Sequence, residues 1–142
     1  GDVPDPQAEE TFRRSKLNRA LQTEPRHAAL LALHRELLRL RRDLSVLREL
    51  ERSRTHVAHD DSGTLVVRRW SEEGEFVAAF RLRAEPGNVA LPLAGGPWRK
   101  LLDSEEERWQ GAGSAVPPTI DSAGSVVVSL AGWSFVMLYR ER

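Results

Sequence analysis

The sequence predicts an α+β chain in which a helical segment is followed by an all-β antiparallel sandwich. The first observation is a run of leucines within residues 25–44, spaced three or four positions apart as on one side of an α-helix. The second is a change of pattern near residue 53, after which apolar and polar residues alternate in short runs separated by glycine-containing turns. We therefore expect two parts, residues 1–52 and residues 53–142.

The predicted central helix needs an apolar surface on which to pack. Its principal leucines fall on one side, at positions 30, 33, 37, 40, 44 and 47, and Leu31 and Leu38 widen this stripe. Burying these eight leucines contributes on the order of 10–25 kcal/mol, against roughly 1–2 kcal/mol per residue for ordering the backbone. The helix is therefore not stable alone. A paired coiled coil is the weaker alternative, because the repeat covers fewer than three heptads.

The segments that flank this helix have weaker patterns. Residues 1–6 contain two prolines and two aspartates, which favour a connecting loop. Residues 7–21 predict a short, imperfect helix, with acidic residues early and basic residues late. Pro25 suits the first turn of the central helix. Beyond residue 44, the pattern leaves open whether the helix continues, kinks or gives way to a second short helix.

The sandwich is expected to contain six to eight short strands. Residues 75–84 alternate most clearly: Phe76, Ala78 and Phe80 share one face, which we expect to be the core face. Residues 103–118 predict a long polar loop. The other strands are expected at residues 56–59, 64–70, 88–93, 98–102, 125–130 and 133–140.

Composition excludes several classes of protein. Twenty-one basic residues balance twenty-one acidic ones, so the charge indicates neither a nucleic-acid partner nor an anionic membrane. The absence of cysteine excludes disulfides, thiolate catalysis and zinc sites built on sulfur. No apolar run approaches the roughly 20 residues of a membrane span, and no signal peptide is visible. We expect no cofactor. The start at Gly1, without a methionine, points to a processed or excised piece.

Four histidines are candidates for a metal site or a catalytic base. His56 and His59 are three positions apart, which places them on opposite faces of a strand, and no carboxylate cluster accompanies them. His27 and His34 can share one face of the central helix. The favoured interpretation of His34 is a hydrogen-bonded histidine at the seam between the helix and the surface that covers it. We predict no metal site.

Acidic and aromatic residues give two further candidates. The three glutamates at 105–107 invite comparison with the paired carboxylates of glycosidases, but neighbouring positions in one loop do not hold two carboxylates across a bond. Trp98, Trp109 and Trp133 could form a platform on which sugar rings stack; the alternative is that they are core residues or loop anchors. No phosphate-binding loop and no nucleophile–base pair is found. The residues alone therefore predict no catalytic group.

Residues 25–44 also resemble the last helix of the catalytic barrel in glycoside hydrolase family 13, the α-amylase family, where a leucine-arginine-arginine run leads into a C-terminal β domain. Shorter motifs are similar to those of the malto-oligosyltrehalose trehalohydrolases within that family. These motifs are residues 3–7, 11–17, 102–105, 108–111 and 132–134. The chain departs from the family at Asn18-Arg19, where an acid and an aromatic are usual, and at Ser45-Val46, where a proline is common.

The resemblance implies that residues 1–52 are the terminal helices of a (β/α)8 barrel and that residues 53–142 form a Greek-key C-terminal sandwich. It implies a cytoplasmic enzyme that hydrolyses the α-1,4-glucosidic bond next to the trehalose end of maltooligosyl trehalose and releases trehalose. The family's catalytic carboxylates lie upstream, on barrel strands. This chain is therefore expected to have a structural role and to be inactive alone.

Asp5 and Gln7 are the substrate-binding candidates that the resemblance supplies, because loops at the carboxyl ends of barrel strands build the substrate cleft. The expected partners are maltooligosyl trehalose and trehalose, bound by the parent enzyme, and the upstream barrel, on which this chain packs. The alternative is a non-catalytic carbohydrate-binding or bracing module of another family 13 enzyme, such as a glycogen branching enzyme.

Overall fold

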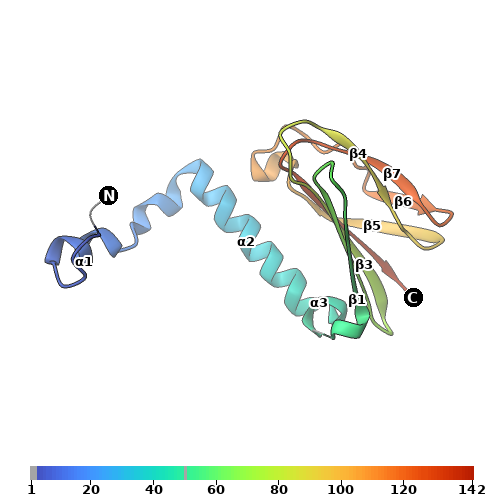
Figure 1. Cartoon of the computed structure of the whole chain (residues 1–142), viewed down its shortest axis with the longest axis horizontal. Coiled ribbons are helices and arrows are strands. Elements are labelled where there is room, and N and C mark those ends of the chain that lie inside the picture. Colours follow the sequence, from blue (N-terminus) through green and yellow to red (C-terminus); the bar gives the residue numbers. More distant parts are fainter. Residues whose placement is uncertain (1–2, 50) are drawn as a thin grey trace.

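The computed structural model describes residues 3–49 and 51–142, which form a β-sandwich with a helical arm on one side (Figure 1). The arm contains α1 (Glu9–Ser15), the 3-10 turn η1 (Arg19–Thr23), α2 (Pro25–Asp43) and α3 (Ser45–Arg48). In Figure 1, α1 lies farthest from the sandwich and α3 lies against it. No helix in the described part of the chain is both long and apolar enough to cross a membrane.

The structure confirms the predicted central helix as α2. Pro25 occupies its first turn, where the missing N–H would have no partner inside the helix. Leu44 ends the helix: its N–H still donates to the carbonyl oxygen of Leu40 at 3.0 Å, but its own backbone is extended, with φ −99° and ψ 118°. The chain then turns into α3, so the open question at residue 44 is answered by a second short helix. The imperfect helix expected at residues 7–21 is divided into α1 and η1.

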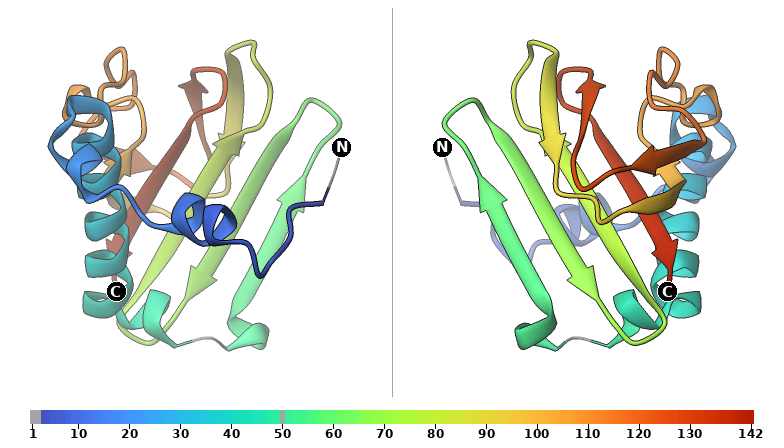
Figure 2. Two further views of the ribbon diagram at one scale, coloured as in Figure 1. Left: turned by 90° about the vertical axis from the view of Figure 1, so that its left-hand side faces the viewer. Right: turned by 90° about the vertical axis from the view of Figure 1, so that its right-hand side faces the viewer.

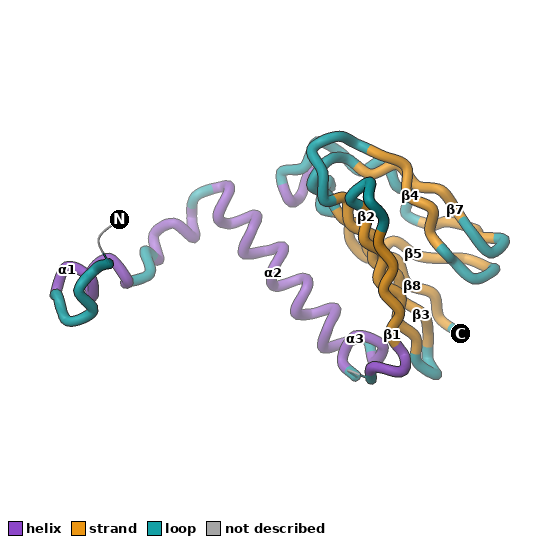
Figure 3. Tube along the Cα trace, in the orientation of Figure 1, coloured by secondary structure: helices purple, strands orange, loops and turns teal. Residues whose placement is uncertain are grey.

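Eight strands form two antiparallel sheets (Figures 2 and 3). The larger sheet has the order β1-β2-β3-β8-β5-β6, and β4 and β7 form the smaller one. The strands are β1 (Thr55–His59), β2 (Thr64–Trp70), β3 (Gly74–Arg81), β4 (Gly87–Leu91), β5 (Gly96–Asp103), β6 (Thr119–Ser122), β7 (Val126–Leu130) and β8 (Phe135–Glu141). The 3-10 turn η2 (Arg52–Arg54) precedes β1.

The six-stranded sheet lies between the helical arm and the two-stranded sheet (Figure 1). Its order is not sequential, because β8 pairs with β3 on one side and with β5 on the other. The chain thus leaves the large sheet after β3, builds β4, and returns, as in the expected Greek-key sandwich. Trp98 is the largest fully buried side chain, and its indole N–H donates to the carbonyl oxygen of Ala94 at 2.8 Å.

Strand β3 is buried on both faces, which corrects the expected position of the core. Val77 and Ala79, each 0% exposed, point into the main core between the two sheets. Phe76 and Ala78 lie on the outer face instead, in a second cluster with Val46 of α3. Alternation along a strand shows which residues share a face. Alternation does not show which face is more deeply buried when both faces carry apolar side chains.

Strand β6 was not predicted. It is four residues long and follows Pro117-Pro118, a pair that indicates a loop, and only its second and fourth residues, Ile120 and Ser122, are buried. Two buried positions are too few to establish a period of two. The pairing with Gly96–Arg99 of β5 nevertheless extends the large sheet to its sixth strand.

Candidate interaction surface

Helix α2 is held to the sandwich along one side of its C-terminal half. Leu40 is 3% exposed, and Ser45 and Val46 of α3 are buried beside it. The Ser45 hydroxyl donates to a carboxylate oxygen of Glu73 at 2.6 Å. These contacts fix the angle at which α2 leaves the sandwich.

A second contact comes from the loop between β5 and β6. Its 3-10 turn η3 (Glu107–Trp109) packs against α2. The pKa of Glu36 on α2 lies below its ordinary value, mainly because Arg39 donates a hydrogen bond to its carboxylate at 2.6 Å, and the positive charge of Arg108 in η3 adds to the shift. The positive charge of Arg108 in η3 therefore lies close enough to α2 to lower the pKa of Glu36.

The other side of α2 carries exposed leucines. Leu30 is 51% exposed and Leu38 is 66% exposed. With His34 midway between them, they follow one line along the helix, distinct from the line through Leu33 and Leu40 that faces the sandwich. A concave surface between η1 and α2 adjoins the exposed line. Its apolar lining residues are Leu17, Leu21, Leu30 and Leu31. Within the described residues, the leucine stripe is thus buried on one flank only.

Asp5 and Gln7 lie in the exposed turn that leads into α1. A side-chain oxygen of Asp5 accepts a hydrogen bond from the backbone N–H of Gln7 at 2.9 Å, and the carbonyl oxygen of Asp5 accepts from Ala8 at 3.2 Å. Asp5 therefore shapes the turn, while the Gln7 side chain is exposed. Their assignment as substrate-binding residues remains a prediction.

The histidines do not form a site. His34 donates from Nδ1 to the carbonyl oxygen of Leu30 at 2.8 Å, within the helix, and its ring is exposed. His27 is exposed as well, with Nε2 at 3.9 Å from a carboxylate oxygen of Glu24. His56 and His59 are exposed on β1. In the part of the chain that the structure describes, no three histidine or carboxylate groups gather closely enough to hold a metal ion.

The loop after β5 uses its carboxylates to hold its own shape. Glu105 accepts a hydrogen bond from the backbone of Ala112 at 3.3 Å, and Glu106 pairs with Arg108 and, at 3.9 Å, with Lys100. Buried Asp103 accepts from the hydroxyl of Ser114 at 2.5 Å. These groups brace the loop that carries η3.

The three tryptophans do not form a common platform. Trp98 lies in the core and is 0% exposed, so no ligand reaches its ring. Trp109 is half-buried in η3, with the guanidinium of Arg108 at 4.4 Å from its ring centroid. Trp133 is 70% exposed, in the turn between β7 and β8. A sugar platform built from all three rings is therefore wrong.

The sequence did not predict a buried ionic cluster centred on Glu75. Glu75 is 3% exposed, and its two carboxylate oxygens accept hydrogen bonds from Arg68, Arg140 and Arg142, each at 3.1 Å. Burial alone would raise the pKa of Glu75, but the hydrogen bonds from Arg142 and Arg68 and the neighbouring positive charges outweigh it and lower the pKa. The two C-terminal arginines are more than sixty positions away, so local sequence gives no signal of this cluster.

Comparison with known proteins locates the chain within larger enzymes. No protein-family profile matches it. It is 44% identical over 120 residues to the malto-oligosyltrehalose trehalohydrolase of Deinococcus radiodurans, a match that covers 81% of this chain and 20% of that protein. The protein of the same name from Brevibacterium helvolum is 46% identical over 111 residues, with 68% and 19% covered. The chain therefore spans about a fifth of the length of these relatives.

Solved structures agree with these matches. A putative α-amylase from Salmonella typhimurium is 32% identical, with a TM-score of 0.62, over 98% of this chain and 20% of that one. The α-amylase from H. orenii shares the fold at 15% identity, with a TM-score of 0.60 over 87% of this chain.

Together, the helical arm, the sandwich and these matches define a C-terminal part of an α-amylase-type glycoside hydrolase. Within that class, the chain belongs to the malto-oligosyltrehalose trehalohydrolase family.

Proposed function

We propose that this chain is the C-terminal part of an enzyme that hydrolyses the α-1,4-glucosidic bond next to the trehalose end of maltooligosyl trehalose, releasing trehalose. The observation that carries the proposal is the 44% identity to a malto-oligosyltrehalose trehalohydrolase over 81% of this chain. Such identity over both the helical arm and the sandwich supports a shared parent architecture.

In this proposal, residues 1–52 are the end of the catalytic (β/α)8 barrel and residues 53–142 are its C-terminal sandwich domain. The exposed line of Leu30, His34 and Leu38 packs on the upstream barrel, which supplies the apolar surface that the leucine stripe requires. The sandwich holds the opposite flank of α2 through Leu40 and η3. The role of this chain is therefore to brace the barrel of a cytoplasmic enzyme.

The chemistry belongs to carboxylates of the upstream barrel. Enzymes of this type use one carboxylic acid to protonate the leaving oxygen and one carboxylate to attack the anomeric carbon, with retention of configuration. The buried carboxylates of this chain, Glu75 and Asp103, already accept hydrogen bonds from arginine and serine side chains. Asp5 and Gln7 are its proposed contribution to substrate binding, from a turn before α1.

Product analysis of the intact parent polypeptide tests the proposal. The parent is incubated with maltooligosyl trehalose, and free trehalose is measured by chromatography. We expect trehalose release. If the parent instead cleaves or branches maltodextrin and frees no trehalose, the trehalohydrolase assignment is wrong, and another α-amylase-family activity, such as that of a glycogen branching enzyme, takes its place.

A further inference from the structure

Strand β1 is an edge of the large sheet, and its outer side has no partner strand among the described residues (Figure 2). Natural proteins commonly protect such edges with a lysine, a proline or a β-bulge, because unpaired N–H and C=O groups recruit other extended chains. The opposite edge strand, β6, directly follows Pro117-Pro118. Strand β1 contains neither lysine nor proline, and it pairs with β2 without a bulge. Its outer side is therefore open to pairing with another strand.

Alternate residues of β1 direct their backbone groups to this open side. The N–H of Asp60 donates to the carbonyl oxygen of Thr64 at 3.1 Å, and this pair continues the register between β1 and β2. Hydrogen-bonded pairs and non-hydrogen-bonded pairs alternate along an antiparallel ladder. The backbone groups of residues 56, 58 and 60 therefore face β2, and those of residues 55, 57 and 59 point away from it.

The open side of β1 is complementary to itself. When a second copy of β1 runs antiparallel with Val57 opposite Val57, the N–H of each valine donates to the carbonyl oxygen of the other. His59 of each copy then lies opposite Thr55 of the other copy, and its N–H donates to the Thr55 carbonyl oxygen. The N–H of Thr55 needs no new partner, because it already donates to the carbonyl oxygen of Arg52. A two-fold axis at Val57 therefore satisfies the outward N–H groups of both strands.

The charges at the two ends of β1 favour the same antiparallel arrangement. Arg52 and Arg54 precede the strand, and Asp60 and Asp61 follow it. Antiparallel pairing brings the arginines of each copy beside the aspartates of the other. Parallel pairing would place like charges side by side, which is unfavourable. Glu51 weakens the attraction without cancelling it, because it pairs only with Arg54, at 3.0 Å.

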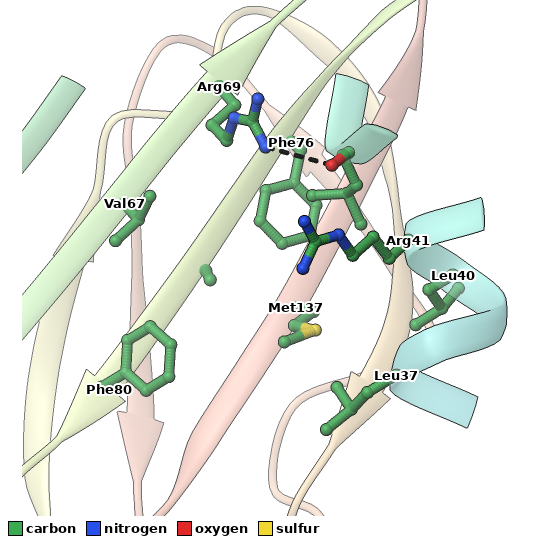
Figure 4. Close-up of a pocket in the computed structure, with 10 residues that line it drawn as sticks. Leu37, Leu40, Arg41, Val67, Arg69, Phe76, Phe80 and Met137 are labelled. Atoms are coloured by element: carbon green, nitrogen blue, oxygen red, sulfur yellow. Dashed lines mark hydrogen bonds between the residues drawn. The ribbon is translucent and has the colours of Figure 1, made fainter. Parts of the chain in front are cut away.

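The side chain at the centre of the strand adds an apolar contact. Val57 lies opposite Val67, which is on the outer face of the large sheet with Phe80 and Met137 (Figure 4). Val57 is 53% exposed. In the antiparallel pair, the two Val57 side chains lie next to each other on this face and cover part of each other's exposed surface. Strands of this length bury a small area, so the association is weak and depends on concentration.

We infer that β1 is a self-pairing edge, at which a second copy of this chain adds its own β1 antiparallel to the first. The two large sheets then form one continuous sheet across a two-fold axis. The second copy is the occupant because both the hydrogen-bonding groups and the terminal charges of β1 are matched by β1 itself. This inference does not depend on the trehalohydrolase activity.

Sedimentation of the intact parent at increasing concentration, up to its solubility limit, tests the inference. Val57→Pro removes the outward N–H and leaves the hydrogen bonds between β1 and β2, and proline is tolerated on edge strands. Val57→Thr is the matched control, because it keeps both the N–H and the branched side chain. We expect a monomer–dimer equilibrium whose Kd rises at least about tenfold in Val57→Pro and less than about threefold in Val57→Thr. A parent that stays monomeric, or a dimer that Val57→Pro leaves unchanged, would overturn the inference.

Cross-linking provides a second test that does not require the proline variant to fold. The Cα atoms of a hydrogen-bonded antiparallel pair lie about 5.5 Å apart, within reach of a short bis-thiosulfonate reagent. The chain contains no cysteine, so Val57→Cys adds a unique thiol to it, and Val127→Cys, on β7 at 63% exposure, is the control. We expect mass spectrometry to find a peptide linked through position 57 of both copies, and little linkage through position 127. Equal yields from the two variants would contradict the self-pairing edge.

Discussion

At the scale of single residues, Gln7 is the cleaner of the two substrate-binding candidates. Asp5→Ala removes a hydrogen bond that shapes the turn, whereas Gln7→Ala leaves the backbone N–H that Asp5 binds. If the Gln7 amide contacts sugar, its loss removes one hydrogen bond to the substrate. We then expect the KM for maltooligosyl trehalose to rise about 2–10-fold, with little change in kcat. Steady-state kinetics of the parent measure this effect. Glu10→Gln, which alters only an exposed ion pair, is the control. An unchanged KM in Gln7→Ala removes this residue from the site.

Glu75 makes the stability of the fold depend on pH. Because three arginines hydrogen-bond its carboxylate, Glu75→Gln leaves their charges poorly compensated, and we expect it to lower the free energy of unfolding by about 2–3 kcal/mol at neutral pH. The pKa of Glu75 is lowered in the folded protein, so its stabilisation is present above the unfolded-state pKa of about 4.3 and is lost as pH falls through the lower folded-state value. The difference between wild type and variant should therefore shrink below about pH 4.

Urea unfolding at several pH values measures this difference. Glu85→Gln is the matched control, because Glu85 is exposed and its replacement is expected to change stability by less than about 0.5 kcal/mol. A Glu75→Gln penalty that is the same at pH 7 and at pH 3 would contradict the electrostatic explanation.

At the scale of elements, two leucines on α2 separate its flanks. Leu40 is 3% exposed and Leu38 is 66% exposed. Leu40→Ala creates a cavity against the sandwich, and we expect a loss of about 2–4 kcal/mol in the chain of residues 1–142. Leu38→Ala should change stability by less than about 0.5 kcal/mol there, since alanine is a good helix former. Denaturant unfolding of the two variants compares them directly, and similar losses would mean that both flanks are packed within this chain.

The sequence predicts elements well where the pattern is long and fails where it is short. The leucine period and Pro25 predict α2, and the β-branched run from Thr64 to Trp70 predicts β2 with the bounds that the structure has. The sequence does not predict strand β6, because the strand has only two buried positions and follows a pair of prolines. The burial of β3 on both faces is not predicted for a different reason. Alternation shows which residues share a face of the strand, but not which layers cover each face.

At the scale of the whole molecule, the sequence indicates that α2 needs an apolar surface to pack on, but not which flank of the helix the sandwich covers. Leucine spacing gives the angle of each side chain about the helix axis, and the division between Leu40, which faces the sandwich, and Leu30, which is exposed, depends on where the sandwich lies. The same limit hides the Glu75 cluster, whose members meet only when β3 pairs with β8. Contacts of this range require the tertiary fold, whereas the family motifs can be recognised from local sequence alone.

The central position of β8 has a consequence for how the protein is made. On the ribosome, β1, β2 and β3 emerge before β8, and so do β5 and β6, yet the large sheet has the order β1-β2-β3-β8-β5-β6. Until residues 135–141 are translated, β3 and β5 each keep an edge of unpaired N–H and C=O groups, and such edges recruit other extended chains. Strand β8 is translated after both of its neighbours and thus closes both edges at once, and a ribosome that stalls shortly before it releases a nascent chain prone to aggregation.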